Sequence, residues 1–103
     1  MHVITRKRLV DFWTTHEDAA TPLRSWLQMM HHRRYSDSNE LKGDFPTASL
    51  LKDGCTVFNI GGNKYRLVVT MRYDMGKVYT YRVLTLKEYD EHTRNGNVCP
   101  EGQ

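Results

Sequence analysis

Apolar residues follow one spacing in the first third of this chain and another after its middle. Up to about residue 34 they recur every three or four positions, which is typical of amphipathic helices. From residue 56 onward, runs of β-branched and aromatic residues are separated by glycine turns, which is typical of strands. The pattern predicts an α+β fold: two N-terminal helices packed on an antiparallel sheet, followed by a short C-terminal helix.

The helical part follows a short predicted strand at residues 3–4, and Thr5 is the expected N-cap of the first helix. Thr21 followed by Pro22 predicts the start of the second helix. Both helices carry apolar stripes, which we interpret as core positions covering one face of the sheet. The stripe residues are Leu9, Val10, Phe12 and Trp13 in the first helix, and Leu23, Trp26, Leu27 and Met30 in the second.

The sheet is predicted to contain strands at Thr56–Ile60, Lys64–Tyr73 and Val78–Thr85. Because short turns join them, consecutive strands must be antiparallel. A short helix is expected from Leu86 to about Thr93. Residues 1–93 therefore form the expected single domain, and the glycine-, proline- and asparagine-containing segment 94–103 is expected to be a flexible tail.

Composition places the chain among small polar proteins, with 103 residues and a mean hydropathy of −0.67. No apolar run approaches the roughly 18 residues of a membrane helix, and the charged N-terminus lacks the apolar core of a signal peptide. We therefore expect a cytoplasmic protein without a membrane partner. Cys55 and Cys99 are then expected to stay reduced, and neither has a second cysteine at metal-ligand spacing. No metal site is predicted.

Positive charge gathers in the predicted sheet although the net charge of the chain is only +3. Segment 64–87 contains six basic residues and a single acid, Asp74. Such cations are common on solvated faces and at sheet edges. As a cluster they favour a surface that binds nucleic acid. The basic residues are Lys64, Arg66, Arg72, Lys77, Arg82 and Lys87.

A family resemblance is carried by the string VFNIGGNKYRLVV at residues 57–69. It is followed by another predicted strand and by TLKEYD at residues 85–90, and preceded by matching helical segments. Together these segments resemble the HigB toxins of bacterial toxin–antitoxin pairs, which belong to the RelE-like messenger-RNA-cleaving toxins. The resemblance spans roughly residues 1 to 91 and implies a RelE-like fold.

The resemblance implies a metal-independent endoribonuclease that needs no cofactor and acts on messenger RNA during translation on the ribosome. In such a reaction the ribose 2′-OH attacks the adjacent phosphate, and the protein must move protons and stabilise the extra negative charge. Arg66 is the expected phosphate clamp, with Lys64 as a second cation or proton shuttle. Arg82 and Tyr89 complete the expected catalytic set. RNA contacts are expected from Lys42, Asn63, Arg72 and Lys87.

The chain departs from the family pattern at two positions. Family members usually have histidine where this chain has Leu86, and leucine cannot transfer a proton. The arginine of the preceding strand falls on Tyr81 in an ungapped comparison, so Arg82 comes one residue late. A shift of one residue moves a side chain to the opposite face of a sheet unless a β-bulge restores it.

Three functions follow from these observations. The first is a toxin nuclease neutralised by an antitoxin of the HigA type, a helix-turn-helix protein, with operator DNA bound only through the complex. The second is an attenuated module that binds RNA, the ribosome or antitoxin without efficient cleavage. The third is a protein-binding domain for an acidic partner. The salt dependence of binding distinguishes RNA binding from the protein-binding domain, because affinity for phosphates falls steeply as the salt concentration rises.

Overall fold

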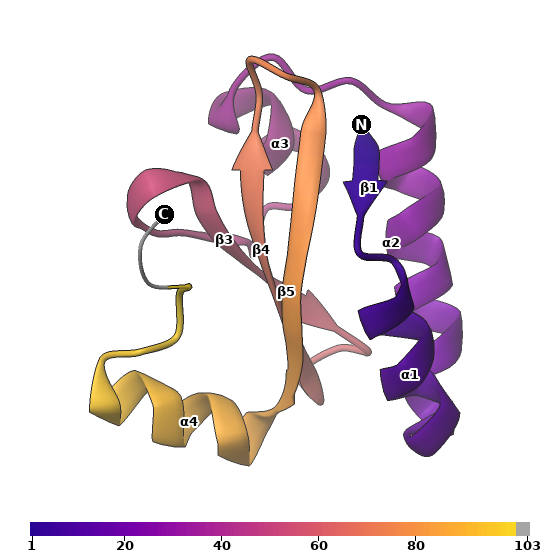
Figure 1. The fold of residues 1–103 in the computed structure, drawn as a ribbon, viewed down its shortest axis with the longest axis vertical. Helices are drawn as coiled ribbons and strands as arrows, with labels where there is room; N and C mark the ends of the chain where they lie inside the picture. Colours follow the sequence, from indigo (N-terminus) through magenta and orange to yellow (C-terminus); the bar gives the residue numbers. More distant parts are fainter. Residues whose placement is uncertain (101–103) are drawn as a thin grey trace.

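The computed structural model describes residues 1–100, in which helices cover one face of a five-stranded sheet (Figure 1). This arrangement confirms the predicted α+β class. The strands are β1 (His2–Ile4), β2 (Ser49–Leu50), β3 (Cys55–Ile60), β4 (Tyr65–Arg72) and β5 (Lys77–Thr85). The α-helices are α1 (Lys7–Thr15), α2 (Ala20–His32), α3 (Ser38–Asp44) and α4 (Leu86–Asn95), and two 3-10 turns are η1 (Glu17–Ala19) and η2 (Lys52–Gly54).

The order of the strands across the sheet is β1-β5-β4-β3-β2. The pairs β3–β4 and β4–β5 are antiparallel, as predicted. The prediction of a purely antiparallel sheet is wrong, because β1 pairs with β5 in the parallel direction, with Val3 opposite Val78. Only tight turns force neighbouring strands to be antiparallel, and β1 is separated from β5 by the whole helical layer and most of the sheet.

Both predicted helix starts are displaced. Thr5 has a positive φ of 69° and does not cap α1, which begins at Lys7. Instead, its carbonyl oxygen accepts a hydrogen bond of 2.6 Å from the hydroxyl of Thr80, which ties the end of β1 to β5. Helix α2 begins at Ala20, so Pro22 lies in its first turn. Backbone N–H groups there have no acceptor within the helix, so the N–H that proline lacks costs no hydrogen bond.

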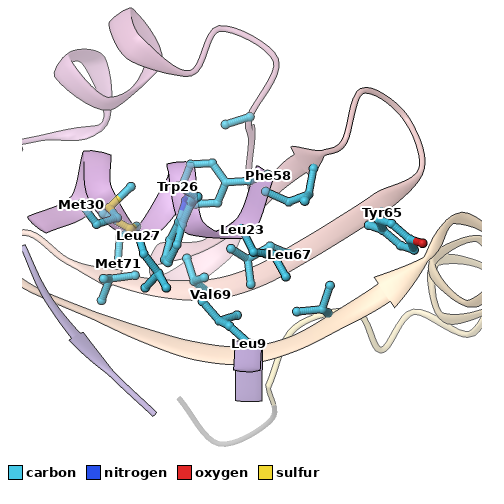
Figure 2. Close-up of a cluster of buried hydrophobic side chains, with 14 of the residues drawn as sticks. Leu9, Leu23, Trp26, Leu27, Met30, Phe58, Tyr65, Leu67, Val69 and Met71 are labelled. Atoms are coloured by element: carbon cyan, nitrogen blue, oxygen red, sulfur yellow. The ribbon is translucent and has the colours of Figure 1, made fainter. Parts of the chain in front are cut away.

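The main core lies between α1, α2 and the inner face of the sheet (Figure 2). Leu23, Trp26 and Met30 of α2 are buried, as the predicted apolar stripe requires. Trp26 packs edge-to-face against Phe58 of β3, with ring centroids 5.5 Å apart. Trp13 of α1 is only partly buried at the margin of this core. Tight packing of these side chains fixes the sheet rigidly beneath the helices.

The opposite face of the sheet, here called the outer face, carries a second small core. Val57, Val68 and Leu84 are buried there under Val98, which follows α4. The chain segment 96–100 thus lies against the sheet instead of forming part of a loose tail, and α4 ends two residues later than predicted. The rest of the expected tail, residues 101–103, lies outside the described residues.

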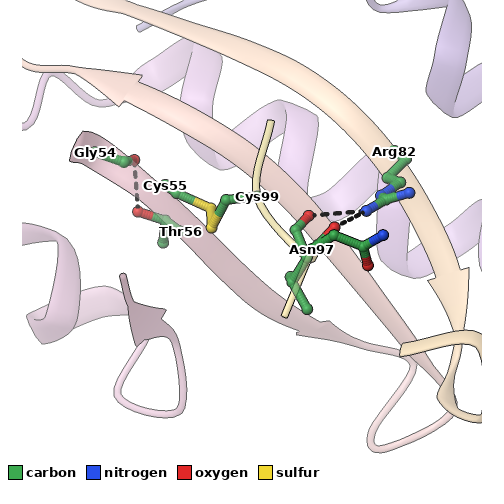
Figure 3. Close-up of a disulfide and its surroundings, with 7 residues drawn as sticks. Gly54, Cys55, Thr56, Arg82, Asn97 and Cys99 are labelled. Atoms are coloured by element: carbon green, nitrogen blue, oxygen red, sulfur yellow. Dashed lines mark hydrogen bonds between the residues drawn. A yellow bond between two sulfur atoms is a disulfide. The ribbon is translucent and has the colours of Figure 1, made fainter. Parts of the chain in front are cut away.

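A disulfide between Cys55 and Cys99 joins the start of β3 to this C-terminal segment, with their Cα atoms 6.0 Å apart (Figure 3). The expectation of two free thiols is therefore wrong for this structure. The pairing depends on the return path of the chain, which local sequence patterns do not predict. The chain turns at Gly96, in the left-handed conformation with φ 72°, and brings Cys99 back over β3. In the part of the chain that the structure describes, no helix has both the length and the apolar character needed to cross a membrane.

Candidate active site on the outer face

Strand alternation places the predicted phosphate clamp on the outer face. Leu67 and Val69 of β4 are fully buried in the main core, so Arg66 between Tyr65 and Leu67 points to the other side. Arg66 lies opposite Asn59 on β3 and opposite Leu84 on β5. It is half-buried there, at the end of the sheet from which α4 departs.

A β-bulge places Arg82 on the same face. Arg82 pairs with Val68, whereas Thr80 pairs with Val69, so Tyr81 is an extra residue on β5. The bulge absorbs the one-residue offset seen in the sequence and orients Arg82 with Val68 toward the outer face. Arg66 and Arg82 consequently stand in diagonal positions on neighbouring strands, a separation of about 7–8 Å between backbone positions.

Arg66 is held in place without an acidic partner. Its Nη1 donates hydrogen bonds to the carbonyl oxygens of Asn63 at 3.3 Å and Tyr65 at 3.1 Å. Its guanidinium carbon lies 5.6 Å from the centre of the Tyr89 ring. Within residues 1–100, no carboxylate forms a salt bridge with Arg66, so its charge is oriented but not neutralised.

Helix α4 brings Tyr89 to this arginine because its start is fixed by a capping box. The hydroxyl of Thr85 accepts from the backbone N–H of Glu88 at 3.2 Å, and the Glu88 carboxylate accepts from the Thr85 N–H at 2.8 Å. Tyr89 also packs against the small outer core. It anchors the helix and leaves one face beside Arg66.

Arg82 is tied to the C-terminal segment (Figure 3). Its Nη2 donates to the carbonyl oxygens of Asn97 at 2.5 Å and Val98 at 3.1 Å, and its guanidinium lies 4.6 Å from the centre of the Tyr81 ring. The Nε atom is buried and lacks an acceptor among the described residues. Most of this guanidinium is thus engaged by the protein itself, unlike that of Arg66.

His92 was not singled out from the sequence, yet it belongs to this cluster. Its Nε2 lies 3.4 Å from Nη1 of Arg82, and its Nδ1 lies 2.9 Å from Oδ1 of Asn97. One signal in the sequence could have found it: His92 follows Tyr89 by three positions, so the two share a face of α4.

Lys64, which the predicted strand Lys64–Tyr73 puts on the same face as Arg66, does not lie beside it. Its Nζ forms a salt bridge of 2.9 Å with Asp18, in η1 on the helical side of the molecule. The hydroxyl of Tyr65 donates to the same carboxylate. Strand alternation fails here because Lys64 lies in the turn before β4 begins. The hydrogen bonds from Tyr65 and Lys64 lower the pKa of Asp18, and that from Tyr65 to Asp18 raises the pKa of Tyr65.

The predicted RNA-contacting residues divide into two groups. Lys42 donates to the carbonyl oxygens of Pro46 and Ala48, both at 2.8 Å, and so closes the turn after α3. Asn63 is exposed in the turn before β4, and its carbonyl oxygen accepts from Arg66. Lys87 is exposed in the first turn of α4, two positions before Tyr89 and therefore on another side of the helix. Lys42 is held by its own loop, whereas the other two are exposed, and Asn63 borders the candidate site.

Two hollows flank the C-terminal segment on the outer face. One, of about 350 Å³, has Arg72, Tyr79 and Tyr81 in its walls, and Arg72 also approaches Asp74 at 3.5 Å. The other, of about 730 Å³, lies between η2, α4 and the C-terminal segment and includes Tyr89. Aromatic rings next to arginines are suited to stacking unpaired bases. Among residues 1–100, no group of three or more His, Cys, Asp or Glu side chains could hold a metal ion.

Comparison with known proteins adds an independent line of observation. A family model described as HigB_toxin, RelE-like toxic component of a toxin-antitoxin system, matches residues 19–92. The mRNA interferase toxin HigB of Escherichia coli K12 is 34% identical over 95 residues, which covers 90% of this chain and 91% of that protein. Proteins named mRNA interferase HigB from Escherichia coli O157:H7 and Shigella flexneri match with the same identity and coverage.

Proposed function

This chain belongs to the HigB family of RelE-like toxins of toxin–antitoxin systems, and we propose that it is an endoribonuclease that cleaves messenger RNA. The relatives that match almost its whole length are named mRNA interferases. One observation supports the location of the active site above all: Arg66 is fixed on the outer face, against Tyr89, without an acidic partner in residues 1–100.

The proposed reaction needs no external nucleophile. The 2′-oxygen of the ribose bonds to the adjacent phosphorus while the bond from phosphorus to the 5′-oxygen breaks, which leaves a 2′,3′-cyclic phosphate and a 5′-OH. Negative charge builds on the phosphoryl oxygens in the transition state. The guanidinium of Arg66 donates two parallel hydrogen bonds to these oxygens, and it does so without first breaking a salt bridge.

The remaining predicted residues take supporting roles. Tyr89 presents its ring to a base next to the cleaved bond. Arg82, whose Nη2 is used by two carbonyl groups, positions the C-terminal segment and contacts RNA at most with its other nitrogens. Asn63, Arg72 and Lys87 contact the RNA backbone around the site. Lys64 contributes a more distant positive charge, because Asp18 holds its ammonium group on the helical side.

Membership of the family supports a proposal for the partners. We propose that a helix-turn-helix antitoxin of the HigA type neutralises this toxin, that the pair contacts operator DNA through the antitoxin, and that cleavage takes place in the cytoplasm on messages held by the ribosome. Because the 2′-OH is the nucleophile, the reaction as written uses no cofactor. A messenger RNA threaded through a ribosome is single-stranded, so its bases are free to stack on a tyrosine ring.

A second candidate is an attenuated module that binds RNA, the ribosome or the antitoxin. Leu86 favours it, since this leucine is 39% exposed at the start of α4, where the family pattern has a histidine. An exposed leucine beside a basic surface fills no core position. The loss of a proton-transferring group there would lower cleavage without disturbing the fold.

Controlled induction of the chain in bacteria, without an antitoxin, tests the proposal. Sequencing of message 5′ ends, combined with enzymatic identification of the new termini, distinguishes the candidates. If the chain is a nuclease, we expect growth arrest, new 5′-OH ends inside translated frames and matching 2′,3′-cyclic phosphate ends. Soluble expression with normal growth and intact messages would refute the nuclease and support the attenuated module.

A further inference from the structure

We propose that His92 accepts the proton of the attacking 2′-OH and so fills the role that Leu86 cannot perform. This inference rests on the proposed ribonuclease function and names a further catalytic residue for it. His92 is half-buried in the last turn of α4, three residues beyond Tyr89 and in contact with Arg82. The residue type suits the task, because histidine changes its charge between pH 5 and pH 8.

The contacts of His92 assign its two ring nitrogens. A guanidinium only donates hydrogen bonds, so the nitrogen that faces Nη1 of Arg82, Nε2, must carry a lone pair. The carbonyl oxygen of the Asn97 side chain only accepts, so Nδ1, at 2.9 Å from it, must carry the proton. The cluster therefore holds the imidazole as a base, with its unprotonated nitrogen toward the outer face arginines. Arg82 and Asn97 are positioning residues in this account.

This arrangement is built into the end of α4 itself. Gly96 ends the helix in the left-handed conformation, and the backbone N–H of Asn97 donates to the carbonyl oxygen of His92 at 3.1 Å. The same turn is the Schellman cap that commonly ends helices. It places Asn97 over the ring of His92 through local backbone geometry, independently of the disulfide at Cys99.

The position of His92 relative to Arg66 fits a single nucleotide. Tyr89 touches Arg66, and residues three apart on a helix have Cβ atoms about 5–6 Å from each other. Arg66, Tyr89 and His92 therefore form a row along the junction of α4 with the sheet. A phosphate bound to Arg66 leaves the ribose on its 5′ side within reach of His92 while a base lies on Tyr89.

The proposed step exchanges one bond between phosphorus and oxygen for another. The contact between Nε2 of His92 and Nη1 of Arg82 opens when RNA binds. Nε2 then takes the proton from the 2′-OH, and the 2′-oxygen forms its bond to phosphorus. The bond between phosphorus and the 5′-oxygen breaks, and that oxygen keeps the electron pair and takes a proton from water. His92 returns its proton to solvent after the products leave. No oxidant, metal or covalent intermediate with the protein takes part.

The test compares wild type, His92→Gln and a matched control, His32→Gln, whose histidine lies in the last turn of α2. Single-turnover cleavage of a ribosome-bound message is measured from pH 5 to pH 8.5, together with affinity for the same RNA carrying a 2′-deoxy residue at the cut site. We expect His92→Gln to lower the rate by about 100-fold or more and to abolish its rise with pH. Its RNA affinity should stay within about threefold, and the control should match wild type.

A second measurement on the wild-type protein does not depend on the folding of any variant. Nitrogen NMR of the imidazole should find the proton on Nδ1 of His92 and the lone pair on Nε2. A proton on Nε2 of the neutral ring would overturn the inference, as would a His92→Gln enzyme with the wild-type rate and pH profile. If either of these results is found while the wild-type protein cleaves RNA, the role of His92 is refuted and the proposed function stands. If wild type does not cleave at all, the proposed function fails with it.

Discussion

The guanidinium of Arg66 and the ring of Tyr89 lie 5.6 Å apart, although one residue comes from a central strand and the other from the last helix. The contact orients the arginine but does not neutralise its positive charge, because the tyrosine ring carries no net charge. The capping box at Thr85 and Glu88 fixes the direction of α4 and therefore this contact. The site is thus assembled by secondary structure rather than by a mobile loop.

Tyr89 is predicted to act through its ring and not through its hydroxyl. Tyr89→Phe keeps the ring and should leave the single-turnover cleavage rate within about threefold of wild type. Tyr89→Ala removes a stacked base contact of about 1–3 kcal/mol, so RNA affinity and rate should fall by about tenfold or more. A Phe variant as defective as the Ala variant would show that the hydroxyl transfers a proton.

Lys64 is predicted to matter less than Arg66. Its ammonium group is 2.9 Å from Asp18 and its side chain points to the helical side, so Lys64→Ala should lower the cleavage rate by less than about tenfold. The measurement is the single-turnover rate of Lys64→Ala beside that of Arg66→Ala. Equal losses in the two variants would place Lys64 at the phosphate during the reaction.

Three of the six tyrosines are predicted to ionise late. Burial, followed by the hydrogen bond to Asp44, raises the pKa of Tyr35; the hydrogen bond to Asp18 raises that of Tyr65; burial raises that of Tyr73. A group with a raised folded-state pKa stabilises the fold fully below its unfolded value, about 10 for tyrosine, and less as pH rises further. Alkaline titration followed by phenolate absorbance should show that Tyr35, Tyr65 and Tyr73 ionise above pH 10, and the free energy of unfolding should fall in the same range.

The disulfide is predicted to stabilise the protein through the C-terminal segment. It closes a loop over a sequence separation of 44 residues, for which loop-closure entropy gives an estimate of about 4 kcal/mol. Cys99→Ser should lower the free energy of unfolding by about 2–4 kcal/mol in urea and speed amide exchange near Val98. The same variant measured with a dithiol reductant serves as its control and should show no further loss. An unchanged midpoint for Cys99→Ser would mean that the packing of Val98 alone holds the segment.

Structural features that depend on residues close together in the sequence could be predicted, and those that depend on residues far apart in the chain could not. The helical stripe around Trp26 and the hairpins of β3, β4 and β5 follow from local spacing, and the structure confirms them. Thr5 and Thr21 resembled helix caps, but a tertiary hydrogen bond to Thr80 and an earlier start of α2 overrode local preference.

The residues of the candidate site divide in the same way, into those that local spacing predicts and those that depend on contacts between distant segments. Arg66 follows from strand alternation, and the need for a bulge at Arg82 could be stated but not located, because a bulge depends on pairing between strands. Lys64 was misplaced since alternation ends where the strand ends. His92 and the Cys55–Cys99 bond depend on where the chain travels after Gly96, and one left-handed residue decides that path.

The most direct test of the account is the single-turnover cleavage rate of Arg66→Ala on a ribosome-bound message, measured beside its RNA affinity. Lys7→Ala is the matched control, because it removes an exposed cation from α1, on the helical layer. The account predicts that Arg66→Ala stays folded and loses about 100-fold or more in rate, with a smaller loss of affinity, while Lys7→Ala cleaves like wild type. A folded Arg66→Ala protein that cleaves at the wild-type rate would contradict the placement of the active site on the outer face.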